Sequence, residues 1–257
     1  MLRYIDDNPA SYPGIFENAV TKITEKDETV LISALKKLNT REDLESAVDT
    51  EEVMRYFVVH SFVVNGDSYT GNTGDNYYLY ERGGKLKMIP WDYNFSFRDD
   101  VMTDWTEEEH ASVTVNYPID TPVTGGGVSE RPMLAWILED GAYTEKYHEL
   151  YREFMKDVYE NNWLQEEIAR VSAMTASCLE TDPTLFISYE EIQNAVEGFR
   201  LLCDLRCKSV AGQLDGTIPS TGEGQAQNPD TLVDASMVKM SEISRPPYNQ
   251  LTEELFR

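Results

Sequence analysis

The segment 56–98 constrains the fold more strongly than any other part of the chain. It opens with a nearly continuous apolar run, 56–64, which is followed by a polar, glycine-rich loop. Two runs of strand-forming residues, 76–80 and 85–89, then flank a turn that contains Gly83 and Gly84. A Gly-Gly turn between two such runs is typical of a β-hairpin. We therefore expect a buried helix that leads through a loop into a hairpin.

Three polar side chains stand at the ends of these elements: Asp67, Asn76 and Asp92. If the turn is centred on Gly83-Gly84, Asn76 falls opposite Trp91, one step from Asp92. Directly opposed residues of an antiparallel pair lie roughly 5 Å apart, and diagonal neighbours lie within about 8 Å. The loop before the hairpin brings Asp67 towards the same end. The sequence therefore predicts that Asp67, Asn76 and Asp92 converge.

Two carboxylates and an amide oxygen form a set of hard oxygen ligands. Such a set suits Mg²⁺ or Mn²⁺ better than Zn²⁺, which is bound mainly by His and Cys. Mg²⁺ is usually held by one or two carboxylates, with water and substrate phosphates as its other ligands. A further Asp could orient or deprotonate a hydroxyl, as phosphoryl transfer requires. The alternative interpretation is that these residues belong to ordinary loops and that Asp92 caps a turn.

A second spacing competes for the role of Asn76. Asp67 and Asn72 are separated by four residues, as are the Asp and Asn of a protein-kinase catalytic loop. The hairpin geometry favours Asn76, which starts the first strand, over Asn72, which lies in a loop rich in Asn and Gly.

The remainder of the chain reads as helices, so the predicted fold class is α+β and mostly helical. Capping-box patterns predict helices from Thr24, Thr40, Asp49 and Ser188. The helix from Asp49 is apolar nearly all round and should be buried, with His60 as a core histidine. Apolar periodicity predicts further helices over 131–139, 144–159 and 164–179, and ends the helix from Ser188 near Gly212. We expect segment 99–127 to be a long irregular loop, and 216–257 to be a polar linker or a disordered tail.

The net negative charge of the chain favours some classes of binding partner over others. The 257 residues carry a formal net charge of −24, which repels nucleic acid and anionic membranes and attracts basic proteins. The alternative interpretation is that the surplus Asp and Glu residues only keep the protein soluble. From these residues we expect neither a signal peptide nor a membrane-spanning segment, because no apolar run is long enough to span a bilayer. Cys203 and Cys207 lie four apart on a predicted helix and read as small core residues, and together with Cys178 they do not settle the redox compartment.

Several segments together resemble the CotH kinase family, the spore-coat protein H-like atypical protein kinases. The strongest similarity lies in 64–69 (VNGDSY), 76–80 (NYYLY) and 88–94 (MIPWDYN). It continues through 116–120 (NYPID), 131–136 (RPMLAW) and 212–216 (GQLDG), and covers most of residues 4–219.

The resemblance implies a divergent protein-kinase-like fold over residues 1–215. It implies an ATP- and Mg²⁺- (or Mn²⁺-) dependent enzyme that phosphorylates Ser or Thr in proteins. Asp67 would be the catalytic Asp, Asp92 the metal-binding Asp and Asn76 a second metal-site residue. The expected substrate is a basic, Ser/Lys-rich protein, and the family favours the spore coat or the cell envelope as its location.

The sequence also departs from the family pattern. We expect residues 1–215 to represent the C-terminal lobe, because no glycine-rich loop followed by a strand lysine precedes Tyr56. Asp75 and Arg98 stand where the family more often has a His-like residue and Gly. Without the lysine, ATP affinity should be low. A pseudokinase that binds basic spore-coat or envelope proteins is therefore the alternative, and a metal-dependent hydrolase is a third hypothesis.

Overall fold

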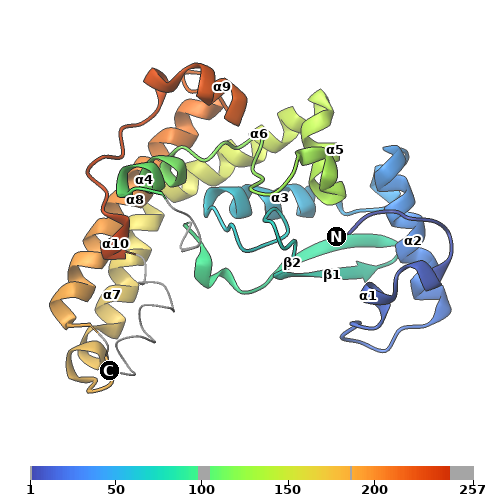
Figure 1. Cartoon of the computed structure of the whole chain (residues 1–257), viewed down its shortest axis with the longest axis horizontal. Helices are drawn as coiled ribbons and strands as arrows, with labels where there is room; N and C mark the ends of the chain where they lie inside the picture. Colours follow the sequence, from blue (N-terminus) through green and yellow to red (C-terminus); the bar gives the residue numbers. More distant parts are fainter. Residues whose placement is uncertain (1, 98–104, 186, 244–257) are drawn as a thin grey trace. The chain divides into compact units, whose positions relative to one another are not determined.

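The computed structural model describes residues 2–97, 105–185 and 187–243. Helices make up 61% of the described residues, and the strands β1 (Tyr77–Arg82) and β2 (Lys85–Pro90) form a two-stranded antiparallel sheet (Figure 1). The expected α+β class with a helical majority is confirmed. The chain divides into two compact units: the first consists of 1–60, 65–93 and 123–150, and the second of 61–64, 94–122 and 151–257.

The first unit combines the hairpin with helices from both ends of its sequence. Its helical elements, some of which continue into the second unit, are η1 (Pro9–Ser11), α1 (Pro13–Phe16), α2 (Glu25–Thr40), η2 (Leu44–Ser46), α3 (Thr50–Phe62), η3 (Tyr93–Phe95), η4 (Val128–Glu130), α5 (Pro132–Glu139) and α6 (Gly141–Met155). The capping box of α2 is present as predicted, because the Thr24 N–H donates to the Asp27 carboxylate at 2.7 Å. The short helix expected from Thr40 is reduced to the 3₁₀ turn η2, because α2 runs through Thr40 and the next residue, Arg41, has a left-handed φ of 60°.

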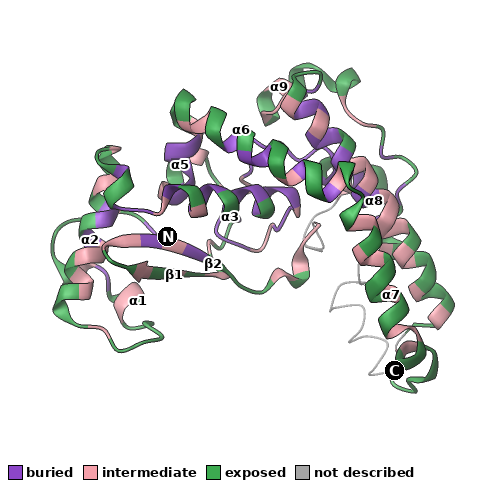
Figure 2. Ribbon diagram, turned by 180° about the vertical axis from the view of Figure 1, so that it is seen from behind, coloured by how far each residue is buried: buried purple, intermediate pink, exposed green. Residues whose placement is uncertain are grey.

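Helix α3 is the buried helix that the sequence predicts. Val53, Met54 and Phe57 are almost fully buried, and Figure 2 shows α3 largely buried along its length beside the hairpin. The start of α3 is pinned to β2 by backbone hydrogen bonds: the Leu86 N–H donates to the Ala47 carbonyl at 2.8 Å, and the Asp49 N–H donates to the Leu86 carbonyl at 3.0 Å. These bonds fix the hairpin to the helix that precedes the candidate site.

The hairpin register agrees with the prediction from its turn. Tyr77 pairs with Pro90 and Arg82 pairs with Lys85, while Gly83 and Gly84 form the turn with φ values of 65° and 90°. Positive φ at both turn residues is what a tight hairpin of this kind requires. Continuing this register by one position places Asn76 opposite Trp91.

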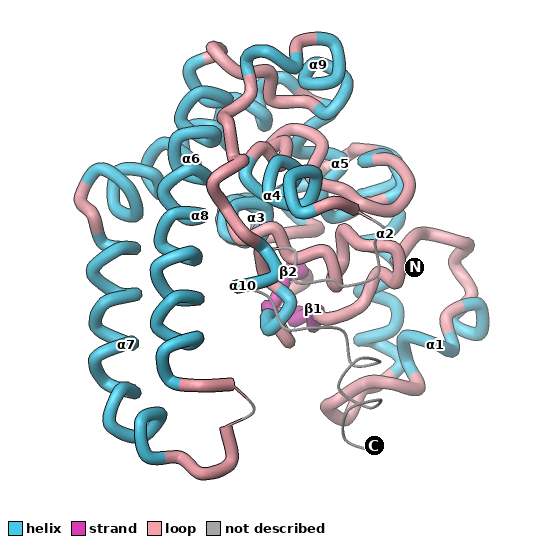
Figure 3. The backbone as a smooth tube through the Cα atoms, turned by 60° about the vertical axis from the view of Figure 1, so that its left-hand side comes forward, coloured by secondary structure: helices cyan, strands magenta, loops and turns pink. Residues whose placement is uncertain are grey.

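The second unit is built around two long helices. Its elements are α4 (Glu107–Val115), a π-helical turn (Lys156–Glu160), α7 (Trp163–Thr181), α8 (Tyr189–Asp215), α9 (Gly222–Gln227), η6 (Pro229–Thr231) and α10 (Met240–Ile243). Helices α7 and α8 run side by side (Figure 3). Cys203 and Cys207 of α8 are buried free thiols, as expected. The Ser188–Glu191 capping box opens α8, which extends past Gly212 to a left-handed Gly216.

Part of the segment expected to be irregular is a helix. Thr106 and Glu109 form a capping box, and α4 then buries Ala111, Thr114 and Val115. The acidic run 107–109 lies within the segment predicted to be a loop, although acidic residues are favourable in the first turn of a helix.

Arg98 lies outside the described residues. On α7 the expected apolar side is largely exposed, since Val171 and Met174 are 40% and 62% accessible.

The segment after residue 216 is described as far as residue 243. Here α9, η6 and α10 follow one another, and Ala235, Val238 and Met240 pack into a core cluster with Ala111 and Leu202. Residues 216–243 are therefore a folded part of the second unit, whereas 244–257 lie outside the described residues. None of the described helices combines the length and apolarity that a bilayer crossing requires.

Candidate functional site

The three predicted site residues flank the hairpin in the first unit. Asp67 lies in the loop after α3, Asn76 immediately precedes β1, and Asp92 follows β2 by two residues. Asn76 and Asp92 both have left-handed backbones, with φ values of 52° and 54°. Such conformations are uncommon for residues other than Gly, and Asn and Asp are among the residues that tolerate them best. The chain therefore turns sharply at both ends of the hairpin where these side chains are placed.

Asn76 is in direct contact with Asp67. Its side-chain Nδ2 donates to the backbone carbonyl of Asp67 and to Asp67 Oδ2, both at 2.9 Å. Asn72, the competing residue, instead packs its side chain and backbone against Gly125, where an added Cβ would meet Asn72 Oδ1 at 2.4 Å. Of the two asparagines, Asn76 is the one that hydrogen-bonds Asp67, and its role in a metal site stays a prediction.

Asp92 is solvent exposed at the open end of the hairpin. Among the described residues, the side chain of Asn76 hydrogen-bonds Asp67 and not Asp92. The convergence of all three residues on one ion therefore remains a prediction, whereas the pairing of Asp67 with Asn76 is observed.

A buried histidine connects the two halves of this site. His60, near the end of α3, hydrogen-bonds Tyr93 Oη through Nδ1 at 2.8 Å, and through Nε2 it contacts Thr70 Oγ1 at 2.9 Å and Ser68 Oγ at 3.0 Å. Tyr93 is the neighbour of Asp92, and Ser68 is the neighbour of Asp67. His60 is a core histidine, as the sequence suggested, and its contacts tie the segments that carry both aspartates.

The hydrogen bonds around His60 define its protonation. The Ser68 hydroxyl donates its single hydrogen to the Asn65 carbonyl at 2.7 Å, so it accepts from His60 Nε2. In a neutral ring Nδ1 is then the acceptor for the Tyr93 hydroxyl. Complete burial lowers the pKa of His60 to about 3, because the charged imidazolium is not solvated there. His60 is therefore a neutral positioning residue at physiological pH.

This burial makes stability depend on pH. Between pH 6.5 and about 3 the unfolded chain protonates His60 while the folded chain does not, so stability falls as pH falls. We expect His60→Gln to remove this dependence, with the wild type losing about 2 kcal/mol more than the variant between pH 7 and pH 5. Urea unfolding of both proteins at the two pH values measures the difference. Identical pH dependences would show that His60 is protonated in the folded protein.

The loop between Asp67 and Asn76 is held by a buried arginine that the sequence did not reveal. Arg131 is 1% exposed, and its Nη2 donates to the carbonyls of Gly71 and Gly125 at 2.7 and 2.6 Å. Gly71 is also tightly constrained, because a Cβ there would meet the Gly66 carbonyl oxygen at 2.0 Å. Nothing in the local sequence distinguishes Arg131 from a surface arginine, since arginine is rarely buried.

The donor chemistry fits a hard divalent cation with few protein ligands. Among the described residues, no three or more His, Cys, Asp or Glu side chains are grouped so that they could hold a metal ion. Asp67, Asn76 and Asp92 offer carboxylate and amide oxygens at an open end of the hairpin. Mg²⁺ commonly takes one or two carboxylates and obtains its remaining ligands from water and substrate phosphates. This set is compatible with such an ion.

Comparison with known proteins gives one match. The sequence profile of the family described as CotH kinase protein matches residues 1–209 of the 257. The matched range contains the hairpin, α3 and all three candidate site residues. No curated protein and no solved structure matches the chain.

Proposed function

The chain belongs to the CotH kinase family, and from this premise we propose that it transfers the γ-phosphoryl group of ATP to Ser or Thr hydroxyls of basic proteins. The observation that carries the proposal is the contact of Asn76 with Asp67 at the end of a hairpin that leads to Asp92. We further propose that the helical fold around this hairpin corresponds to a divergent kinase C-terminal lobe.

Each residue has a distinct role in this proposal. Asp67 accepts a hydrogen bond from the substrate hydroxyl and takes up its proton as the oxygen attacks the γ-phosphorus. The bond between the γ-phosphorus and the β–γ bridging oxygen breaks, and ADP leaves. Asn76 donates to Asp67 and so fixes its carboxylate, while its Oδ1 remains as an acceptor. Asp92 and Asn76 would hold Mg²⁺ or Mn²⁺, which neutralises charge on the phosphates when bound.

In this scheme the contacts of His60 hold the site together. His60 keeps the segments of Asp67 and Asp92 in register through Ser68 and Tyr93. Because these bonds are made by a neutral imidazole, the proposed arrangement does not change through the physiological pH range. The acidic composition of the chain favours basic substrates.

The test is a phosphoryl-transfer assay in which the Asp92→Ala variant serves as the negative control. The chain is incubated with γ-labelled ATP, Mg²⁺ or Mn²⁺ and a Lys/Ser-rich protein, in parallel with Asp92→Ala. We expect label in the protein substrate with the wild type alone. Label no higher than that of Asp92→Ala would contradict the kinase proposal and favour the pseudokinase alternative. Release of phosphate without protein labelling would indicate a hydrolase.

A further inference from the structure

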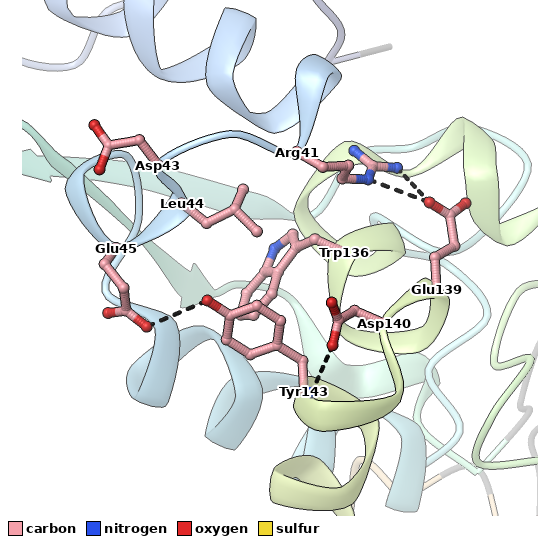
Figure 4. Close-up of a pocket in the computed structure, with 8 residues that line it drawn as sticks. All are labelled: Arg41, Asp43, Leu44, Glu45, Trp136, Glu139, Asp140 and Tyr143. Carbon is pink, nitrogen blue, oxygen red and sulfur yellow. Dashed lines mark hydrogen bonds and ion pairs between the residues drawn. The ribbon is translucent and has the colours of Figure 1, made fainter.

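A cleft in the first unit is lined by residues that are distant in the sequence from Asp67 and Asp92 and include neither of them. It has a volume of about 370 Å³ and is bordered by the loop 41–45 and by residues from α5 and the start of α6. Figure 4 shows its lining: Arg41, Asp43, Leu44, Glu45, Trp136, Glu139, Asp140 and Tyr143. The cleft therefore presents four carboxylates against one guanidinium, and two aromatic rings.

Two of these carboxylates are not neutralised by a basic side chain of the described residues. Arg41 pairs with Glu139 at 2.7 Å, and Lys37 pairs with Asp43 at 2.8 Å. Glu45 instead accepts from the hydroxyls of Thr50 at 3.0 Å and Tyr143 at 3.4 Å. Asp140 Oδ1 accepts from the backbone N–H groups of Ala142 and Tyr143 at the start of α6. Among the described residues, no basic side chain thus forms an ion pair with Glu45 or Asp140.

The indole of Trp136 supplies an independent indication of a ligand. Trp136 is 1% exposed, and its buried Nε1 has no hydrogen-bond partner among the described residues. Buried indole N–H groups usually find an acceptor, and leaving one unpaired is unfavourable. Figure 4 shows the indole nitrogen on the edge of the ring that faces the 41–45 loop. An acceptor entering the cleft there would remove this cost.

The aromatic rings add a surface for a cation. Tyr143 packs edge-on against Trp136, with ring centroids 4.8 Å apart and an interplanar angle of 87°. Aromatic faces attract ammonium and guanidinium groups, most strongly when carboxylates lie close by and water is excluded. The cleft thus offers unpaired carboxylates, an indole N–H and aromatic rings. A ligand that matches all three carries a positive charge, an aliphatic stem and a nearby carbonyl oxygen.

We propose that this cleft binds a Lys or Arg side chain of a basic peptide, with the cation between Glu45 and Asp140 and a peptide carbonyl accepting from Trp136 Nε1. The binding is independent of phosphoryl transfer, so it holds for a kinase and for a pseudokinase alike. If the proposed kinase activity is present, the cleft selects basic substrates through residues that are distant from Asp67 in the sequence of this chain.

The test uses the whole chain and a fluorescein-labelled decapeptide of alternating Lys and Ser, followed by fluorescence anisotropy. Glu45→Gln combined with Asp140→Asn removes both charges and keeps the acceptor oxygens that bind Thr50 and cap α6. We expect it to weaken binding about tenfold, which corresponds to about 1.4 kcal/mol. The control, Glu17→Gln with Glu51→Gln, removes two exposed carboxylates of the same unit and should change the affinity by less than about twofold. Equal weakening by both pairs would show that overall acidity alone attracts the peptide, and would overturn the proposal.

The Trp136 contact has its own readout, which requires no loss of charge. In a ¹⁵N-labelled protein, the indole N–H resonance that disappears in Trp136→Phe identifies Trp136. We expect this resonance to shift downfield as the Lys/Ser peptide is added, and to shift much less with cadaverine, which has the ammonium group but no carbonyl. A resonance that stays fixed during saturation with peptide would overturn the proposed contact, and an equal shift with cadaverine would overturn the assignment to a peptide.

Discussion

Asp67→Asn is expected to lower the rate of protein phosphorylation by about 10²- to 10⁴-fold, the usual contribution of a positioned general base. The amide has nearly the shape of the carboxylate, but it cannot take up the proton of the substrate hydroxyl. The contact with Asn76 Nδ2 can still be made through the remaining oxygen, so the fold of the loop should persist. Initial rates at saturating ATP and peptide, measured with the wild type and the variant, give the ratio.

The matched control is Asp75→Asn in the same loop. Asp75 is exposed and accepts a hydrogen bond from the Thr73 hydroxyl at 2.5 Å. This substitution removes the same charge close to Asn76 and should change the rate by less than about threefold, since exposed charges contribute little. If Asp67→Asn retained more than about a tenth of the wild-type rate, general-base catalysis would not account for the role of Asp67.

Arg206→Met is expected to destabilise the second unit by about 3–5 kcal/mol, as the removal of one member of a buried polar network usually does. Arg206 has no exposed surface. Its Nε and Nη2 donate to the carbonyls of Phe62 and Ser61 at 3.1 and 2.9 Å, and its Nη1 donates to those of Val115 and Tyr117 at 3.2 and 2.7 Å. These carbonyls belong to the ends of α3 and α4 and to the chain just beyond α4. Methionine fills the volume but leaves them without their donor.

Arg170→Met serves as the comparison for Arg206→Met. Arg170 lies on α7 in the same unit, and its ion pair with Glu167 at 2.6 Å is exposed. The loss from this variant should stay below about 1 kcal/mol. Urea unfolding followed by far-ultraviolet circular dichroism, at one pH and salt concentration, measures both variants. Equal losses for the two would contradict the role assigned to the carbonyl network.

The parts of the fold that depend on local chemistry were predictable from the sequence. Gly83 and Gly84 specified the turn, and the turn specified the register that brings Asn76 opposite Trp91. The capping boxes at Thr24 and Ser188 located the starts of α2 and α8. Each of these signals acts over a few residues and requires no knowledge of distant contacts.

The parts that depend on distant contacts were missed or left open. Arg131 reaches the Gly71 carbonyl 60 positions away, and Arg206 reaches carbonyls up to 145 positions away. The residues next to each arginine in the sequence do not indicate that it is buried. Helix α4 was missed because its apolar residues form a core with α8 and with residues near 235–240, and not a clear periodic stripe of their own. The position of Asn76 beside Asp67 could be anticipated because it depends on the geometry of the hairpin.

The division of the chain into two units has a consequence for its synthesis. The sequence passes from one unit to the other after residues 60, 64, 93, 122 and 150, so neither unit is a continuous stretch. A ribosome must therefore deliver residue 150 before the first unit is complete, and most of the chain before the second unit can close. The emerging polypeptide carries the apolar α3 throughout this interval, during which exposed apolar surface favours aggregation. Neither unit can be obtained by truncating the gene at one point, and chaperone dependence during expression should be greatest before α8 has been translated.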